Sequence, residues 1–262
     1  DEITTGGYEF LREATVIHVL QDADSAGTWG RQVLAITANP TAFAKSLAAR
    51  DVKPGHDERV ANLHRTYLEL STPEEPFKEG GVNISAALAS VARHAPADTA
   101  LVTDAGNFAG WVPRFYRFTQ PHTHFGPLSG AMGYAAPAAI GVALARRGRR
   151  VVALAGDGGF AMTMNELATM KAHGLPVTML VFVNEVHGTI RMHQEKHYPG
   201  RPVATDLTNP SFRQLAESFG LQAWTVEDNP AFDDALQAAL ALDGPALIEI
   251  IEGRERLSVW GK

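Results

Sequence analysis

Two polar residues that follow apolar runs give the first indication of chemistry. The segment VVALAGDGG (151–159) runs from five apolar residues into Asp157, and three glycines surround this aspartate: Gly156, Gly158 and Gly159. A second apolar run, PVTMLVFVN (176–184), ends at Asn184, 27 residues after Asp157. A helix between the two runs would return the chain, so we expect both side chains at one crevice. A carboxylate and an amide oxygen suit a hard cation such as Mg²⁺ or Ca²⁺, not zinc or copper.

The same three glycines predict a phosphate group beside the cation. Mg²⁺ held by two protein oxygens normally takes further oxygens from a phosphate ligand. Glycines allow the backbone to approach such oxygens closely and to present N–H groups. HGTIRMHQ (187–194) is predicted to begin a helix with Gly188 and Thr189 in its first turn, and helix starts attract anions. The pattern indicates a metal-bridged diphosphate, and it matches neither the P-loop nor the GxGxxG fingerprint.

The rest of the chain predicts a sheet that would position these turns. From residue 81 onward, continuous apolar runs alternate with helical patterns, which is typical of a parallel sheet covered on both faces. We therefore predict an α/β fold, a doubly wound and mostly parallel sheet with helices on both faces, preceded by a partial α/β domain. Ligands bind such sheets outside the carboxyl ends of the strands. Polar residues follow three predicted strands there: Asp104, Asp157 and Asn184.

Helix starts are predicted from capping residues. Asn83 is a candidate cap for the helix NISAALASVARHA. Thr163 and Glu166 have the spacing of a capping box at the start of TMNELATMKAHG. Asn209 is expected to cap a further helix, with Pro210 in its first turn.

The first fifty residues contain too few elements for a core of their own. Residues 15–20 predict a short buried strand, and residues 40–50 predict a helix that Pro40 begins. Two or three elements cannot bury a core, so we expect this segment to pack on structure absent from the chain. The predicted organisation is a partial α/β domain, a polar linker and a ligand-binding domain: 1–50, 51–80 and 81–262.

The composition excludes several classes of function. The formal net charge of −6 argues against a nucleic-acid surface. The sequence contains no cysteine, which excludes disulfides, thiolate zinc sites and thiol catalysis. No apolar run reaches the roughly 18 residues of a membrane span, and we recognise no secretory signal at the start. We therefore expect a reducing, cytoplasmic setting without a nucleic-acid or membrane partner.

The motif and its surroundings resemble a known enzyme family. GDG followed some 27 residues later by Asn resembles the thiamine diphosphate motif. GDGGFAMTMNELATMKAHGLPVTMLVFVNEVHGTIR (156–191) is similar to the diphosphate-binding domain of the acetolactate synthase, pyruvate oxidase and benzoylformate decarboxylase group. GPLSGAMGYAAPAAIGVALA (126–145) is similar to the segment of that group that seats the aminopyrimidine ring, and TVIHVLQDADSAG (15–27) to the end of its middle domain.

The resemblance implies roles for the matching residues. Asp157, the side chain of Asn184 and the carbonyl of Val186 would bind magnesium. Gly130 would offer its carbonyl to the 4′-amino group, and Met132 would lie beneath the cofactor and force its bent conformation. Further cofactor-binding residues, at the diphosphate or near it, would be Gly156, Gly158, Gly159, Gly188, Thr189, Asn107 and Phe108.

Two histidines are candidate catalytic residues. His187 or His193 would act as a proton shuttle, because the pKa of imidazole suits transfer near neutrality. His193 and His197 are four residues apart, but a transition-metal site would need a third ligand. In the family that the chain resembles, a glutamate of the N-terminal domain, usually from a neighbouring subunit, activates the cofactor. No segment of this chain resembles that domain.

The resemblance implies a thiamine diphosphate- and Mg²⁺-dependent enzyme that decarboxylates a 2-oxo acid and ligates the product to a second carbonyl, as acetolactate synthase does. Three alternatives stay open: a simple 2-oxo acid decarboxylase, a flavin-linked oxidase of the same family, and a non-catalytic phosphate-binding module. Whether FAD binds is also open. His193 stands where acetolactate synthases carry tryptophan, and Asn107-Phe108 where they carry Gln-His. These departures count against acetolactate synthesis itself and not against the cofactor.

The chain is expected to be the C-terminal part of such an enzyme. It would be a truncated form, a proteolysed remnant or the smaller partner of a split enzyme, and a start inside a domain favours truncation. The full enzyme is expected to be a homo-oligomer, a dimer or a tetramer, in which the N-terminal pyrimidine-binding domain or a second subunit completes the site. Alone, the chain would bind the diphosphate end weakly and turn over no substrate.

Overall fold

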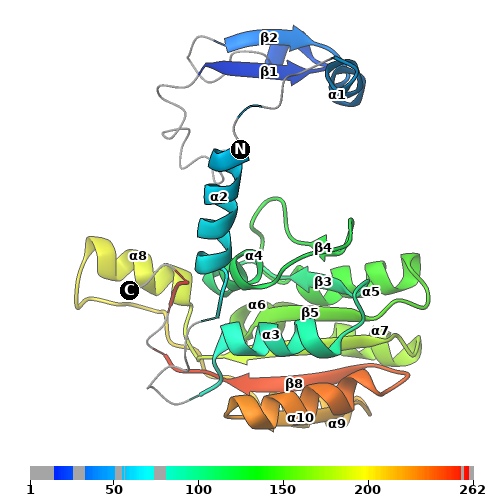
Figure 1. The fold of residues 1–262 in the computed structure, drawn as a ribbon. Helices are drawn as coiled ribbons and strands as arrows, with labels where there is room; N and C mark the ends of the chain where they lie inside the picture. The colour runs from blue at the N-terminus through cyan, green and yellow to red at the C-terminus, as the bar shows by residue number, and fades with distance from the viewer. Residues whose placement is uncertain are drawn as a thin grey trace. The chain divides into compact units, whose positions relative to one another are not determined.

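The computed structural model describes residues 15–25, 33–50, 55, 57–73, 81–254 and 257–259. The chain divides into two compact units, Asp1–His64 and Arg65–Lys262, which are described separately (Figure 1). None of the helices in the described part is long and apolar enough to cross a membrane.

The first unit contains a two-stranded parallel sheet and a helix. Strand β1 (Val16–Leu20) pairs with β2 (Val33–Thr37), and α1 (Pro40–Ala48) follows, capped by the side chain of Asn39. A short 3₁₀ turn, η2 (Ala23–Ser25), lies between the strands. The predicted strand and helix are present, but no residue of β1 is buried as the prediction expected, and β2 was not predicted. No side chain that the structure describes in this unit is buried, as expected for elements that lack a core.

The range 51–80 contains a helix that the polar-linker interpretation did not predict. Helix α2 (Asp57–Leu70) has 14 residues and no buried side chain. Its sequence, DERVANLHRTYLEL, is mainly polar with scattered apolar residues, which explains why its composition suggests a linker. The domain boundaries proposed from the sequence stay a prediction.

The second unit is built on a six-stranded sheet in which every pair is parallel. The strand order is β4-β3-β5-β6-β8-β7. The prediction of a mostly parallel sheet is confirmed; β4 was not predicted, because two residues are too short to show a periodic pattern. The strands are β3 (Ala100–Thr103), β4 (His124–Phe125), β5 (Val151–Gly156), β6 (Val177–Val183), β7 (Gln222–Val226) and β8 (Ala246–Ile251).

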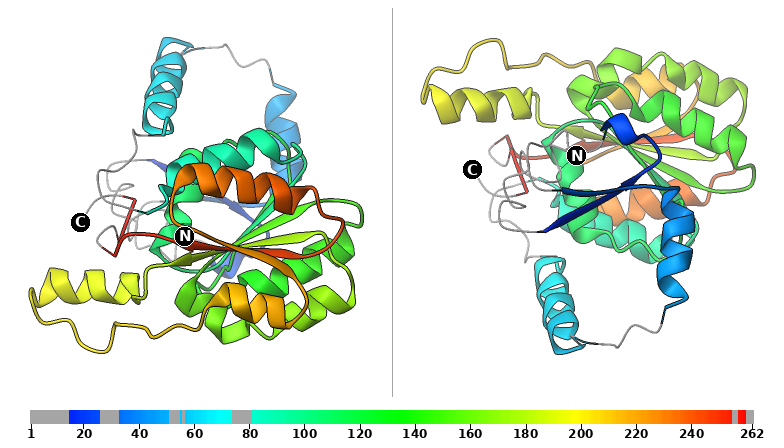
Figure 2. Two further views of the ribbon diagram at one scale, coloured as in Figure 1. Left: turned by 90° about the horizontal axis from the view of Figure 1, so that it is seen from below. Right: turned by 90° about the horizontal axis from the view of Figure 1, so that it is seen from above.

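Helices cover both faces of this sheet, as Figure 2 shows. One apolar cluster joins the sheet to α3 (Ile84–His94), α4 (Trp111–Phe115) and α10 (Asn229–Leu240). A second cluster joins the opposite face to α5 (Ala135–Ala145), α6 (Asp157–Thr163), α7 (Glu166–Ala172) and α9 (Phe212–Ser218). All seven residues of β6 are buried, since the strand lies between both clusters. This arrangement confirms the doubly wound α/β class.

Two capping predictions are wrong. Thr163 ends α6 instead of starting a helix, because the chain is already helical from Asp157; α7 then begins at Glu166 without a side-chain cap. The Thr163 hydroxyl donates to the carbonyl of Gly133 instead, at 3.2 Å. Asn209 does not cap α9, since Ser211 holds that position and accepts from the backbone N–H of Gln214. The cap at Asn83 is confirmed by its bonds to the N–H groups of Ser85 and Ala86.

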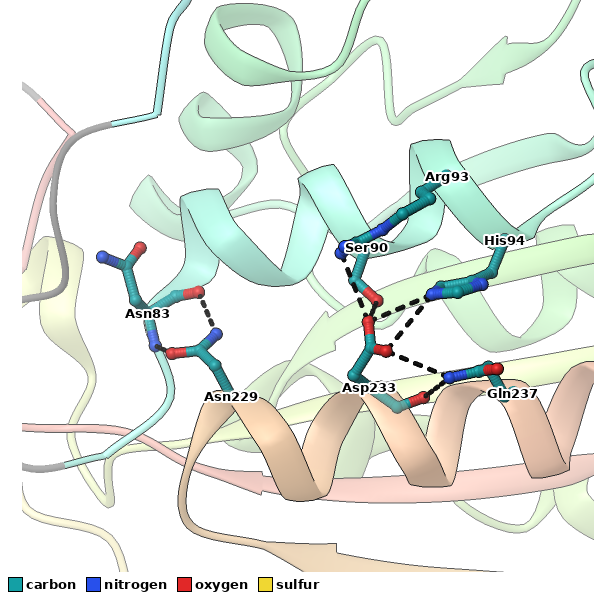
Figure 3. A network of polar contacts seen from close by, with 7 residues as sticks. All are labelled: Asn83, Ser90, Arg93, His94, Asn229, Asp233 and Gln237. Atoms are coloured by element: carbon teal, nitrogen blue, oxygen red, sulfur yellow. Dashed lines mark hydrogen bonds and ion pairs between the residues drawn. The ribbon is translucent and has the colours of Figure 1, made fainter.

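Polar contacts join α3 to α10 (Figure 3). Both helices are distant in sequence from the proposed phosphate-binding motif at residues 156–159. Ser90 and Gln237 donate hydrogen bonds to the Asp233 carboxylate, and Arg93 and His94 lie 3.3 and 3.2 Å from it. Ser90 bonds to Asp233 and not to His94, so this group contains no nucleophile–base pair. The cluster is therefore structural. The Ser90 hydroxyl is the largest of the effects that lower the pKa of Asp233, followed by the charges of His94 and Arg93.

We predict that Asp233→Ala lowers the free energy of unfolding by about 1–2 kcal/mol, because it removes partly exposed, charge-assisted hydrogen bonds. The pKa of Asp233 is lower in the folded state than the ordinary value of 3.8. Its contribution is therefore present above that pH and is lost as the pH falls through the folded-state pKa. Urea unfolding of both proteins over a pH series measures the difference. A difference that stays constant below that pH would contradict the assignment.

Candidate functional site

The site lies where the strand order changes direction. From β3 the chain continues to β4 on one side, whereas β5 pairs with β3 on the other, and ligands bind at such switch points outside the carboxyl ends of strands. A cavity of about 250 Å³ opens there. Thirteen predicted site residues line it together: Asn107, Phe108, Gly130, Met132, Gly156, Asp157, Gly158, Gly159, Asn184, Val186, His187, Gly188 and Thr189.

Asp157 is buried at the end of β5, and backbone and amide donors fix its carboxylate. Its Oδ1 accepts from the N–H of Gly158 at 2.8 Å, and its Oδ2 accepts from the N–H of Glu185 at 2.7 Å. The side-chain amide of Asn209 also donates to Oδ2, at 2.8 Å. Asn209 thus holds the predicted cation ligand, a role that the Asn-Pro helix-start interpretation did not anticipate.

Asn184 and Val186 lie on a tight loop after β6. The Asn184 side-chain oxygen accepts from the N–H of Val186 at 3.0 Å, and the intervening Glu185 has a φ of +57°. Non-glycine residues rarely adopt this conformation. A neighbouring segment braces the loop: His187 N–H donates to the carbonyl of Thr205 at 2.7 Å, and Leu207 N–H to that of Glu185 at 2.8 Å.

Asp104 anchors the loop that carries Gly130 and Met132. Its buried carboxylate accepts from the N–H groups of Gly133 at 2.9 Å, Ala135 at 3.1 Å and Ala105 at 2.7 Å. Gly133 has a φ of +84°, and a Cβ there would lie 3.3 Å from α6 side chains, so the loop requires glycine at this position. The buried Asp104 therefore ties the predicted aminopyrimidine segment to the end of β3.

Neighbouring side chains leave little room for a larger residue at the glycines that follow Asp157. A Cβ on Gly158 would lie 3.0 Å from the ring of His187, and one on Gly159 would lie 3.2 Å from the carboxyl carbon of Asp104. The structure thus adds a packing reason to the predicted one, which was close approach to phosphate oxygens. Both glycines line the cavity with their backbone.

Helix α8 (Gly188–His197) begins at the cavity, and it lies beyond the carboxyl ends of the strands in Figure 2. No side chain caps its first turn, so N–H groups that lack an intrahelical acceptor remain for an anion. The Thr189 hydroxyl accepts from the N–H of Asn107 at 3.1 Å, and the Asn107 amide donates to the carbonyl of Leu257 at 2.8 Å. Phe108 packs on Phe182, with ring centroids 5.8 Å apart.

The two candidate catalytic histidines lie in different places. His187 lines the cavity, with its ring against Gly158. His193 is exposed on α8 and does not line the cavity, and His197 is exposed as well. The structure therefore places only His187 where it could contact a ligand of this cavity. Within the described residues there is no group of three or more His, Asp and Glu side chains that could hold a metal ion.

Glu252 is a cavity residue that the sequence analysis did not identify. It follows β8 directly, and it lines the cavity with Asp157 and Asn184. Burial, and secondarily the negative charge of Asp157, raise the pKa of Glu252 to about 8. The available signal was the same as for Asp157, a polar residue after a buried strand. The run PALIEIIE (245–252) ends in this glutamate, and its pattern alone does not show that Glu252 lies beyond the strand.

These residues fit a hard cation and a diphosphate. The oxygen donors are a carboxylate, an amide and a backbone carbonyl, from Asp157, Asn184 and Val186, which suit Mg²⁺ better than zinc or copper. The carboxyl groups of Asp157 and Glu252 line one cavity. The charge of Asp157 contributes to the raised pKa of Glu252, and a bound cation would favour the ionised form of Glu252. The uncapped start of α8 provides donors for the anion.

Comparison with known proteins identifies the family. Residues 104–250, more than half of the chain, match the family described as thiamine pyrophosphate enzyme, C-terminal TPP binding domain. The chain belongs to this family. The match begins directly after β3 and includes the ends of β5 and β6. Thiamine diphosphate is the ligand that this domain type binds.

The relatives are longer proteins of the same family. The acetolactate synthase large subunit of Porphyra purpurea is 29% identical over 260 residues, which are 95% of this chain and 43% of that protein. The corresponding subunit of Parasynechococcus marenigrum is 34% identical over 256 residues, 95% of this chain and 41% of that protein. A thiamine diphosphate-dependent 4-hydroxybenzoylformate decarboxylase of Rhodococcus jostii RHA1 has a similar structure, with a TM-score of 0.77, 26% identity and coverage of 92% of this chain and 44% of its own. The chain thus spans less than half the length of these relatives.

Proposed function

We propose that this chain is the cofactor-binding part of a thiamine diphosphate- and Mg²⁺-dependent enzyme that decarboxylates a 2-oxo acid and ligates the product to a second carbonyl compound. The observation that carries the proposal is the shared cavity of Asp157, Asn184, Val186 and the start of α8. These groups offer oxygen ligands to a cation and N–H donors to a diphosphate at one switch point.

The residues of this chain would bind and orient the cofactor. Asp157, Asn184 and the carbonyl of Val186 would hold Mg²⁺, and the backbone of Gly158 and Gly188 would meet the diphosphate. The loop anchored by Asp104 would place Gly130 and Met132 against the aminopyrimidine end of the cofactor. Thiamine diphosphate, when bound, supplies the electron sink that accepts the electrons released by decarboxylation. Phe108, Phe182 and Leu257 line the same cavity and would exclude water from it.

The site is proposed to need a second polypeptide region for activity. The cavity of about 250 Å³ is below the range of roughly 300–1,000 Å³ that sites for complete small ligands occupy. Met132 is 40% exposed at this site, although its proposed position is beneath the cofactor. A further domain, from the same enzyme or a partner subunit, would cover this end and provide the acid that activates the cofactor.

The relatives support two reaction outcomes. Acetolactate synthase subunits are among the matching sequences, and they support carboligation. The structural neighbour is named as a decarboxylase of a 2-oxo acid, so a simple decarboxylase is the second candidate. In a complete enzyme, an acyloin product would identify the first activity, and a free aldehyde would identify the second.

The test is native mass spectrometry of the purified chain with thiamine diphosphate, with and without Mg²⁺. We expect an adduct that contains cofactor and Mg²⁺ and that is lost when the cation is chelated. We also expect no turnover of pyruvate by the chain alone. An adduct that forms equally without a divalent cation would contradict the metal-bridged site. Rapid turnover by the isolated chain would contradict the need for a second region.

A further inference from the structure

One carboxylate in the cavity has no side-chain partner among the residues that the structure describes. Glu252 is partly buried, lines the cavity and makes neither a side-chain hydrogen bond nor an ion pair with any residue in the described part of the chain. A glutamate within β8 behaves differently. Glu249 accepts from the N–H of Phe212 at 2.7 Å and from the hydroxyl of Thr225 at 2.6 Å. Glu249 is therefore a structural carboxylate, whereas Glu252 faces a space that a ligand can enter.

The sheet places Glu252 beside the proposed cation ligands. In the register of β6 and β8, Val183 is paired with Ile251, and the N–H of Glu252 donates to the carbonyl of Val183 at 3.1 Å. Glu252 and Asn184 each follow directly after one of two adjacent strands, so the two residues lie side by side. Asp157, the proposed ligand that follows β5, lines the same cavity as Glu252 and Asn184.

We propose that Glu252 is a second carboxylate of the cation site and that it raises the affinity of this chain for the divalent cation. This inference rests on the cation site of the proposed function. Hard cations prefer carboxylate oxygens, and an unpaired, partly desolvated carboxylate is costly unless an opposite charge is near. A cation beside Asp157 would supply that charge.

The proposed role has opposite effects on the two ligands. In its ionised form Glu252 attracts the cation, and the same charge repels a diphosphate that approaches without one. Removing the charge should therefore weaken cation binding while leaving cation-free diphosphate binding equal or stronger. A carboxyl group that merely supported the local structure would weaken both when it is replaced. This difference separates the proposed role from a structural one.

The experiment compares wild type with Glu252→Gln in one buffer, using Mn²⁺ and inorganic pyrophosphate as probes. Electron paramagnetic resonance measures Mn²⁺ binding, and calorimetry measures pyrophosphate binding without a cation. We expect Glu252→Gln to weaken Mn²⁺ binding on the order of tenfold, as loss of one nearby charge implies. We expect its cation-free affinity for pyrophosphate to be unchanged or higher. Equal Mn²⁺ affinity in the two proteins, or parallel loss of both ligands, overturns the proposal.

A matched control removes the same charge from the end of the adjacent strand. Glu227 follows β7 at the same edge of the sheet, is exposed and does not line the cavity. Glu227→Gln should leave Mn²⁺ affinity unchanged; a loss equal to that of Glu252→Gln would reduce the effect to net charge and overturn the proposal. Glu252→Ala provides a second removal if the glutamine variant does not fold. If wild type fails to bind Mn²⁺ even with pyrophosphate, the proposed function fails, whereas equal binding by wild type and Glu252→Gln rejects only the role of Glu252.

Discussion

Replacement of Asp157 by alanine should abolish the cation-dependent part of thiamine diphosphate binding. We expect an affinity loss of more than about 100-fold in the presence of Mg²⁺, since outer-shell partners of a metal alone typically contribute 10–100-fold. The reason is that Asp157 would contribute a charged ligand, whereas Asn184 and the carbonyl of Val186 would contribute neutral oxygens. Titration calorimetry with thiamine diphosphate, with Mg²⁺ and with a chelator, measures the effect. In a phosphate-binding module without a cation, the same variant would lose little affinity.

The control for this prediction must separate ligand loss from misfolding. Asp157 accepts three hydrogen bonds, so Asp157→Ala also leaves buried donors without an acceptor. Asp157→Asn keeps the shape of the side chain and removes the charge, and we expect it to lose cation dependence as well. Asp206→Ala removes an exposed carboxylate from the bracing segment, whose ion pair with Arg191 is at the surface, and it should bind normally. Equal losses for Asp206→Ala and Asp157→Ala would rule out a specific role for Asp157.

The positions of the cation ligands could be predicted because parallel sheets place successive strand ends at one edge. Asp157 and Asn184 follow mainly apolar runs, so their strands and their common edge are evident from the sequence alone. The start of α8 was predictable for a similar reason, because Gly188 and Thr189 come only a few residues after Asn184. Functional residues whose position follows from strand topology can therefore be predicted without a structure.

Other parts of the site depend on contacts between distant segments. Asn209 has the local pattern of a helix cap, but its amide bonds to Asp157, 52 residues away. Glu252 was not identified, because the sequence does not show whether a glutamate at the end of an apolar run is the last residue of the strand or the first residue of the following loop. Gly158 and Gly159 suggested phosphate contacts, and the structure adds that a Cβ at these positions would meet the side chains of His187 and Asp104. Such long-range pairs leave no periodic pattern in the sequence.

Asp104 illustrates how a residue without a proposed ligand contact can control the site. We predict that Asp104→Ala lowers the free energy of unfolding by roughly 3–4 kcal/mol, because buried N–H groups of Ala105, Gly133 and Ala135 lose a charged acceptor. The loop that carries Gly130 and Met132 would then lose its anchor. Thermal and urea unfolding measure the stability change.

Asp104→Ala should affect binding of the two ends of the cofactor differently. Asp104 anchors the loop for the ring end, whereas Asp157 and α8 would bind the diphosphate end. Asp104→Ala is therefore expected to weaken thiamine diphosphate binding by more than about tenfold, the lower bound for loss of an outer-shell partner. Binding of inorganic pyrophosphate with Mn²⁺ should change little, because that probe does not contact the loop. Asp104→Asn, which retains one acceptor oxygen and the side-chain volume, should fall between the two proteins. Parallel losses for cofactor and pyrophosphate would show that Asp104 supports the whole sheet edge, and the selective role of the loop would then be wrong.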